Sequence, residues 1–270
     1  MRVMSWNLWW RFGGAWRERE SGIVETVRQV RPDLLGVVET WAGEGTTQVA
    51  RLADELGGDL ATTFVPTALP PAPDPPEEPS QAGIEVGIGL LSRWPITSTE
   101  VHELPHSQRG GPPPTALLAT VAHPLGPLPV IVACTEWEPV FAADHLAQVT
   151  ALAALATEPR LDGELPVLLI GDLNAAVDQP DLAPLLDVMI DTWPAGGGDP
   201  AAVTLSSAVP EAPLAAAKQL DRRIDHILAR PGRAGGTITV RRAFLAGDRS
   251  IDGRYPSDHF AVVVDLEPSG

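Results

Sequence analysis

Apolar runs and helically spaced apolar residues alternate along the chain and predict a protein of mixed strands and helices. Short apolar runs bounded by Pro, Gly or Asp are typical of buried strands, and they cover residues 2–7, 34–38, 60–65, 84–91, 96–103, 115–122, 128–135, 167–170, 188–193, 223–228, 237–245 and 260–266. Apolar residues three or four positions apart predict helices over residues 18–31, 46–56, 142–156 and 182–186. Two strand-rich halves with helices between some strands indicate two packed sheets flanked by helices.

A proline-rich acidic stretch, residues 66–80, interrupts this pattern. Proline lacks an amide hydrogen and fixes φ, so the stretch is predicted to form neither a helix nor a central strand. Because strand signals resume directly after it, we interpret it as an extended, mobile excursion within a single domain of residues 1–270. The Gly/Pro/Ala-rich residues 194–219 are likewise expected to be a loop.

Polar residues stand where several predicted strands begin or end. Asp172 and Asn174 follow the buried run 167–170, and residues two apart on a strand face the same way, so we expect the two side chains to project together. A single residue of this kind is more often a turn former or a helix cap. Loops at sheet ends are nevertheless where sites assemble, so the candidate site comprises Asn7, Glu39, Asp172, Asn174, Asp225, Asp258 and His259.

The chain is acidic, with a net charge of -16 over its 270 residues. Nucleic acid and anionic membranes repel such a protein at long range, which argues against an architectural DNA-binding protein. An enzyme that reaches a phosphate through a bound metal and a few local arginines is still compatible with this charge. The arginines available for that purpose are scattered at Arg11, Arg17, Arg19, Arg109, Arg249 and Arg254.

Targeting signals and cysteines narrow the class further. No apolar run reaches membrane-spanning length, and the N-terminus shows no signal-peptide pattern, so we expect a cytoplasmic location and a monomer. The single Cys134 excludes an internal disulfide and a cysteine-rich metal site, and its apolar surroundings predict a buried, inert thiol.

The segment that follows the first strand is rich in aromatic residues and arginine. It contains Trp9, Trp10 and Arg11. One interpretation is a surface loop whose rings are tucked onto the core. The other is a rim that contacts substrate, because Trp and Arg stack on bases, sugars or acyl chains.

The polar strand ends also form an ordered set of motifs. These are Ser5-Trp6-Asn7, the strand that ends on Glu39, Gly89 to Pro95, Gly171 to Asn174, Asp191-Thr192-Trp193, Arg223 to Ile227 and Ser257-Asp258-His259. From Met1 to about Leu266 the set resembles the endonuclease/exonuclease/phosphatase family, which includes DNase I-like nucleases, abasic-site repair endonucleases, neutral sphingomyelinases and inositol polyphosphate 5-phosphatases. The resemblance implies an α/β fold, a four-layer α/β/β/α sandwich of two packed, mostly antiparallel sheets, and Mg²⁺-dependent hydrolysis of a phosphoester.

The resemblance also implies a metal site. Glu39 corresponds to the principal Mg²⁺ ligand, with Asn7 beside it and Asp258 near the metal. The donor chemistry agrees independently of the family, because carboxylate and amide oxygens without cysteine suit a hard cation such as Mg²⁺, or Mn²⁺ in its place.

Catalytic roles follow from the same resemblance. Asp172 corresponds to the residue that orients or deprotonates the attacking water, and Asn174 to a partner of a phosphate oxygen. His259 would contact the scissile phosphate or act as an acid/base, oriented by Asp225. A carboxylate on the second ring nitrogen fixes the tautomer of a histidine and favours its protonated form.

Two positions depart from the family pattern. Many members carry a histidine after the strand at 128–135, where this chain has Glu136. We expect Glu136 to take part in the site, for example as a second metal ligand, although a solvent-facing position is the alternative. Repair nucleases of the family carry an acid two residues after the first-strand asparagine, where this chain has Trp9. Both departures count against a nuclease more than against a hydrolase.

The other histidines lie outside the motifs. We interpret His102, His106, His123 and His145 as surface or helix-face residues. His226 alternates away from Asp225 on its strand and is interpreted as structural.

Metal-dependent hydrolysis of a phosphoester is therefore the leading hypothesis. The substrate would be a small molecule, a lipid headgroup or a nucleic acid, and the net charge of -16 slightly favours the first two. A DNA endonuclease or exonuclease is the alternative within this class, and it would need a basic groove. A non-catalytic binding module on the same fold is the alternative from another class, and Glu136 is its best support.

Overall fold

Two β-sheets packed face to face form the centre of the computed structural model, which describes residues 1–12, 15–210, 220–233 and 236–267. The first sheet has the strand order β12 (Thr239–Ala246), β13 (Ala261–Glu267), β1 (Arg2–Asn7), β2 (Leu34–Gly43), β5 (Glu85–Ser92) and β4 (Ala61–Pro66), with the short β3 (Thr46–Thr47) paired to β2. The second sheet has the order β10 (Ile190–Asp191), β11 (Asp225–Arg230), β9 (Val167–Asp172), β8 (Gly126–Cys134), β7 (Thr115–His123) and β6 (Ile96–Glu103).

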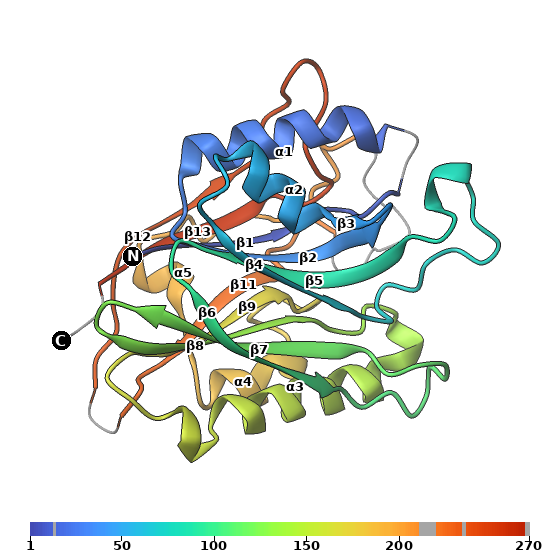
Figure 1. Cartoon of the computed structure of the whole chain (residues 1–270). Helices are drawn as coiled ribbons and strands as arrows, with labels where there is room; N and C mark the ends of the chain where they lie inside the picture. The colour runs from blue at the N-terminus through green and yellow to red at the C-terminus, as the bar shows by residue number, and fades with distance from the viewer. Residues whose placement is uncertain (13–14, 211–219, 234–235, 268–270) are drawn as a thin grey trace.

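Helices cover the outer face of each sheet. In Figure 1, α1 (Trp16–Val30) and α2 (Gln48–Glu55) lie over the first sheet, whereas α3 (Ala142–Ala156) and α4 (Ala183–Leu186) lie over the second. Within the described strands, β1–β2 and β8–β9 pair in parallel and the other neighbours pair antiparallel. The predicted four-layer sandwich with two mostly antiparallel sheets is confirmed.

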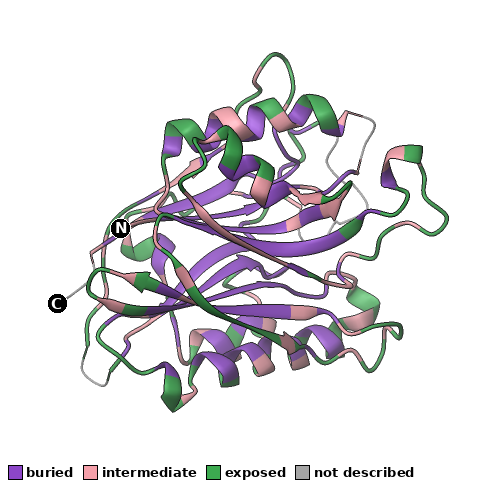
Figure 2. Ribbon diagram, viewed as in Figure 1, coloured by how far each residue is buried: buried purple, intermediate pink, exposed green. Residues whose placement is uncertain are grey.

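Three clusters of apolar side chains form the core between these layers. Figure 2 shows that the strands of the two sheets are largely buried. Ile23 and Val27 of α1 pack on Met4 of β1, and Val149 and Leu152 of α3 pack in a second cluster beneath the other sheet. The inner faces of the sheets approach closely, since a Cβ at Gly36 would lie 2.6 Å from Cγ2 of Ile170. Strands buried on both faces explain the continuous apolar runs of the sequence.

Short 3₁₀ turns connect several elements, and each begins on a proline. They are η1 (Pro79–Gln81), η2 (Pro139–Phe141), η3 (Pro159–Leu161) and η4 (Pro180–Leu182). Proline suits this first position because an amide hydrogen there would have no partner within the helix.

Local capping overrides two element predictions. Of the strand predicted over residues 188–193 only β10 (Ile190–Asp191) forms. It ends there because the Asp191 carboxylate accepts the Trp193 amide at 3.1 Å and caps the short helix α5 (Thr192–Ala195). The helix predicted from residue 46 begins at Gln48, where the Thr47 hydroxyl caps it by accepting the Ala50 amide at 3.2 Å. Both caps are short-range side-chain bonds that apolar periodicity does not register.

The proline-rich stretch is anchored at both ends. Leu69 is fully buried, and η1 closes the stretch with a short helical turn that the sequence did not predict. The side-chain amide of Gln81 donates to the carbonyl of Arg11 at 3.1 Å. Residues 66–80 therefore pack against the loop that follows β1.

One helical segment meets the length and composition of a membrane span, contrary to the expectation from the apolar runs. Pro139–Ala156 has 18 residues and a mean hydropathy of 1.3. This segment contains α3, whose apolar side packs on the second sheet, and 44% of it is buried in the protein. Packing on the second sheet accounts for its buried apolar residues, whereas Val140 and Leu146 are exposed.

Candidate active site

Strand direction brings the predicted site residues to one end of the two sheets. The parallel strands β1 and β2 run toward this end and carry Asn7 and Glu39, and β9 ends there on Asp172. The antiparallel strands β11 and β13 start there, beside Asp225 and His259. Because β1 and β9 contact each other across the sandwich, groups from both sheets meet.

A bulge in β2 presents Glu39. The strand continues to Gly43 instead of ending near Val38, and its pairing with β5 shifts register between Val37 and Thr40. Glu39 lies in this shift with φ of 48°, a left-handed conformation that is unfavourable for a residue with a Cβ. Bulges re-aim side chains, and this one places the carboxylate beside Asn7.

Asn7 joins carboxylates of the two sheets. Its side-chain Nδ2 donates to Glu39 Oε1 at 2.8 Å and to Asp172 Oδ2 at 3.1 Å. Its Oδ1 accepts the backbone amide of Trp9 at 2.8 Å. The amide therefore fixes the spacing between the two acids.

His259 lies between two aspartates. Its Nδ1 is 2.8 Å from Asp225 Oδ2, and its Nε2 is 3.8 Å from Asp172 Oδ2. The short contact to Asp225 orients the ring and leaves Nε2 directed toward Asp172. Ser257 fixes the approach, since its hydroxyl accepts the His259 amide at 3.2 Å and donates to the Asn7 carbonyl at 2.7 Å.

Negative charge accumulates at this end of the sheets. Burial, together with the charge of Asp258, raises the pKa of Glu39 to about 8, and burial with Asp225 raises the pKa of Asp172 to about 7. Burial also raises the pKa of Asp258. For His259, burial lowers the pKa, but the charges of Asp225, Asp258 and Asp172 outweigh it and raise the pKa well above its usual value.

This acidic cluster, comprising Glu39, Asp172, Asp225 and Asp258, fits a divalent cation. Donor atoms of Asp172, Asp225 and His259 lie within 4.8 Å of one another, and Oδ1 of Asp225 is buried without a hydrogen-bond partner in the described part of the chain. Four carboxylates beside one histidine leave an excess of negative charge. Oxygen donors in this arrangement suit a hard cation.

Asn174 reaches the site by a turn instead of by strand alternation. The strand ends at Asp172, and Asn174 has φ of 48°. Its amide donates to Asp172 Oδ1 at 3.0 Å, and its Nδ2 donates to the carbonyl of Thr135 at 2.9 Å. Asp172 and Asn174 therefore lie together, as the sequence predicted, but for a different geometric reason.

A cleft of about 190 Å³ opens over these groups, and much of its lining is apolar. Five of the side chains around the acidic residues come from loops: Trp9, Phe12, Pro70, Trp137 and Leu205. Trp9 and Phe12 both belong to the aromatic segment after the first strand that the sequence indicated as a possible rim. The others carry no motif, although Trp137 directly follows the family departure at Glu136.

Trp10 and Arg11 do not lie at the rim, so this part of the prediction is wrong. Both side chains are buried. The Arg11 guanidinium lies between the rings of Trp16 and Trp41, at 4.1 and 4.2 Å from their centroids. Each of the two interpretations of this loop holds for part of it. Trp9 faces the cleft, whereas Trp10 and Arg11 pack into the core.

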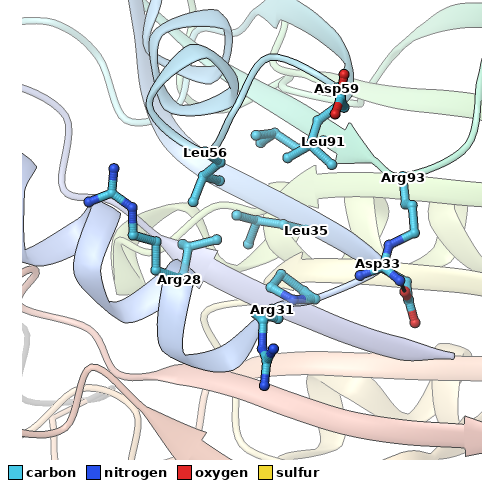
Figure 3. A pocket seen from close by; sticks show the side chains of 11 residues that line it. Arg28, Arg31, Asp33, Leu35, Leu56, Asp59, Leu91 and Arg93 are labelled. Carbon is cyan, nitrogen blue, oxygen red and sulfur yellow. Dashed lines mark ion pairs between the residues drawn. The ribbon is translucent and has the colours of Figure 1, made fainter.

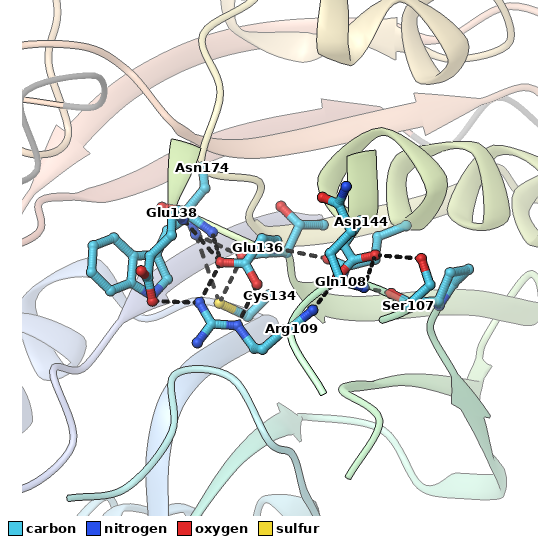
Figure 4. Close-up of polar contacts among 12 residues, drawn as sticks. Ser107, Gln108, Arg109, Cys134, Glu136, Glu138, Asp144 and Asn174 are labelled. Carbon is cyan, nitrogen blue, oxygen red and sulfur yellow. Dashed lines mark hydrogen bonds and ion pairs between the residues drawn. The ribbon is translucent and has the colours of Figure 1, made fainter. Parts of the chain in front are cut away.

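Glu136 neither binds in the acidic cluster nor faces solvent. It is buried and forms a bidentate ion pair with Arg109, with Nε–Oε2 at 2.5 Å and Nη2–Oε1 at 2.6 Å (Figure 4). Arg109 also bonds Glu138 at 2.7 Å. The expected role as a second metal ligand is therefore wrong, because the charge of Glu136 is already matched within the protein.

Two buried histidines contact the backbone of the segment that carries Asp172 and Asn174. His226 is buried, with Nε2 2.8 Å from the carbonyl of Ala175, and it faces away from the cleft as the sequence predicted. His145 was expected as a surface or helix-face residue; it lies on α3 and is buried, with Nε2 2.9 Å from the carbonyl of Leu173. Both rings therefore hold backbone of the segment that carries Asp172 and Asn174. Cys134 is buried as predicted.

A larger cavity of about 270 Å³ lies at the other end of the first sheet (Figure 3). Leu35, Leu56 and Leu91 line its interior, with Arg28 and Arg93 at its edge. None of the predicted site residues lines it, so it is separate from the candidate active site.

Residues 4–259 match the model of the endonuclease/exonuclease/phosphatase family. The chain belongs to this family. Its members are generally hydrolases that act on phosphoesters, so the fold and the strand-end motifs agree with the match. No curated protein sequence matches the chain.

Solved structures of family members share the fold. An endonuclease/exonuclease/phosphatase protein from Beutenbergia cavernae DSM 12333 has 27% identity and a TM-score of 0.70, covering 100% of this chain and 72% of that one. A D. rerio TDP2 humanized by 14 mutations has 16% identity and a TM-score of 0.73, covering 99% and 98%. The human nocturnin catalytic domain has 18% identity and a TM-score of 0.71, covering 100% and 94%. At these last two identities the similarity shows the fold alone.

Proposed function

We propose that the protein hydrolyses a phosphodiester or phosphomonoester with Mg²⁺ or Mn²⁺. The observation that carries the proposal is the position of His259 between Asp225 and Asp172, next to the pair Asn7–Glu39. Glu39 and Asp258 would hold the metal, with Asn7 beside them. When bound, the metal supplies a Lewis acid that polarises the phosphoryl oxygen and stabilises the leaving oxygen.

The protein's own groups perform the proton transfers in this proposal. Asp172 orients a water molecule and accepts its proton as the water oxygen bonds to phosphorus and the P–O ester bond breaks. The protonated His259 directs its Nε2 hydrogen at the phosphoryl group, stabilises the developing charge and protonates the leaving oxygen. Asp225 holds the ring in place, and Asn174 lies beside Asp172 where it can contact a phosphoryl oxygen.

Two alternatives lose support from the arginine contacts. The binding module rested on an uncompensated carboxylate at Glu136, and Arg109 compensates it. A nuclease needs a basic groove, but Arg11 and Arg19 are buried and Arg109 is committed to Glu136 and Glu138. Among the described residues, no arginine or lysine lines the cleft.

Hydrolysis of bis-p-nitrophenyl phosphate with Mg²⁺, Mn²⁺ or EDTA tests the proposal. We expect turnover with metal only, and a decrease in kcat of about 10²–10⁴-fold in Asp172→Asn and His259→Gln, the range that general acid–base catalysis contributes. Asp187→Asn, at an exposed aspartate, is the matched control and should retain wild-type kcat. Turnover in EDTA, or unchanged turnover in both site variants, would contradict the proposal.

A further inference from the structure

Three aromatic side chains, Trp9, Phe12 and Trp137, stand over the acidic cluster and are here called the aromatic wall. They come from two loops that are far apart in sequence, and each loop is held by a buried or mostly buried arginine. Both guanidinium groups bind groups of the protein itself: Arg19 binds backbone carbonyls, and Arg109 binds two glutamates. The backbone that carries the aromatic wall is therefore held in place by contacts within the protein.

Arg19 of α1 holds the first loop. Its guanidinium donates to four backbone carbonyls, with distances of 3.1 Å to Leu8, 3.2 Å to Trp9, 3.1 Å to Trp10 and 2.9 Å to Phe12. It also lies 4.5 Å from the ring centroid of Trp9. These contacts fix the backbone on both sides of the loop and support the Trp9 ring from beneath.

Arg109 holds the second loop through Glu136. The Glu136 carboxylate Oε1 accepts the backbone amides of Trp137 and Glu138, both at 2.9 Å, and this tight turn directs Trp137 to the cleft. Arg109 itself is positioned by Asp144 at the start of α3, which accepts its backbone amide at 2.8 Å (Figure 4). The carboxylate that replaces the family histidine therefore shapes the cleft instead of contacting phosphate.

Charge and shape together limit the substrate. The described lining of the cleft offers one cationic side chain, His259, against the carboxylates of Glu39, Asp172 and Asp258. A bound divalent cation would offset part of this negative charge, which suits one phosphoester group and disfavours several. The aromatic rings at the cleft offer stacking instead, which binds a planar aromatic group without any further charge.

We propose that the aromatic wall binds a planar aromatic group of a singly phosphorylated ester, with Arg19 and Arg109 as positioning residues. This inference rests on the proposed phosphoesterase function and adds the substrate class. Trp9 and Trp137 flank the aromatic group of the ester while its phosphoryl group reaches His259. Glu136 is thereby a specificity-determining residue that acts through Trp137.

Isothermal titration calorimetry with non-hydrolysable phosphonates tests binding apart from turnover. In Mn²⁺, benzylphosphonate should bind about tenfold tighter than ethylphosphonate, a difference of about 1.4 kcal/mol, because its ring can stack on the aromatic wall. Trp9→Ala and Trp137→Ala should bring this ratio close to one, whereas Trp137→Phe should retain most of it. Trp94→Ala is the control, since Trp94 packs on His123 outside the cleft. Thermal unfolding confirms that each variant is folded.

The outcomes separate the two proposals. Equal affinity of the wild-type protein for both phosphonates, or equal weakening of both in the alanine variants, would overturn the aromatic wall while turnover of bis-p-nitrophenyl phosphate still supports a phosphoesterase. Absence of turnover on any phosphoester, with the aryl preference intact, would instead overturn the catalytic proposal.

The single-phosphate requirement has its own test. The KM for thymidine 5′-(p-nitrophenyl phosphate) should not fall when a 3′-phosphate is added to the nucleoside, because the described cleft lining holds no arginine or lysine for it. A tenfold lower KM for the doubly phosphorylated ester would overturn this part of the proposal.

Discussion

At the scale of single residues, the role of a charged side chain depends on its contacts. The number of charges in the sequence does not reveal that role. Arg11 lies between two indole rings, Arg19 caps four carbonyls, and Arg109 neutralises Glu136. All three were candidates for phosphate contact when judged from the sequence. Their contacts show that an arginine near a site motif can stabilise the fold instead of binding a phosphate.

His226 provides a residue-scale prediction for the pH dependence of stability. Burial and Arg223 lower its pKa to about 3, and the neutral ring bridges Arg223 and Ala175. The unfolded chain, with a histidine pKa of about 6.5, therefore binds more protons than the folded protein below that pH. The resulting stability is complete above about pH 6.5 and decreases as the pH falls toward 3.

Urea unfolding of the wild type and His226→Gln at pH 8 and pH 5 measures this effect. We expect the free-energy difference between the two proteins to narrow by about 2 kcal/mol at the lower pH, because the variant has no imidazole to protonate when unfolded. An equal difference at both pH values would show that His226 is not held neutral.

At the scale of elements, the parallel pair β8–β9 positions Asp172, the residue proposed to activate water. A Cβ at Gly171 would lie 1.8 Å from the carbonyl oxygen of Ala133, so only glycine lets β9 approach β8 at this point. Cys134 and Asp172 are partners in the same pairing. The glycine of the Gly-Asp-x-Asn motif thus allows the two strands to pack, whereas the aspartate after it has the proposed catalytic role.

Gly171→Ala should lower the free energy of unfolding by about 3 kcal/mol and reduce kcat, because the strands must separate and displace Asp172. Gly163→Ala is the matched control, since a Cβ there meets nothing within 4 Å, and it should change stability by less than about 0.5 kcal/mol. Chemical unfolding and turnover of bis-p-nitrophenyl phosphate provide the two measurements. Wild-type behaviour of both variants would remove the packing argument.

At the scale of the whole molecule, the net charge of -16 and the acidic cluster act together. The folded protein holds four carboxylates close to one another, and this repulsion is absent in the unfolded chain. A divalent cation that binds the folded state should therefore stabilise the whole domain, by about 2.7 kcal/mol at 100 times its Kd.

Thermal unfolding in Mn²⁺ and in EDTA, at equal ionic strength, measures this stabilisation. We expect Tm to rise by several degrees with metal in the wild type and to respond much less in Glu39→Gln/Asp258→Asn. Asp74→Asn/Glu77→Gln removes the same charge from exposed positions of the proline-rich stretch and should keep the wild-type response. A similar loss of response in both double variants would indicate general charge screening instead of a site.

Local sequence patterns were sufficient to predict the layers of the fold and to propose the main site residues. Apolar runs and helical spacing are local signals of burial, and they predicted most strands, the three longest helices and the sandwich. The ordered motifs at strand ends predicted the group that contains Asn7, Glu39, Asp172 and His259, because strand direction brings such ends together.

The surroundings of that group became clear only from contacts made in the folded chain. The bulge at Glu39, the turn at Asn174 and the partner of Glu136 depend on contacts between segments distant in sequence, which periodicity along the chain does not encode. The pairing of Arg109 with Glu136 spans 27 residues, and it converts a suspected metal ligand into the support of Trp137. The polar residues at strand ends can be recognised from short local motifs, whereas the shape of the cleft above them depends on how the loops pack.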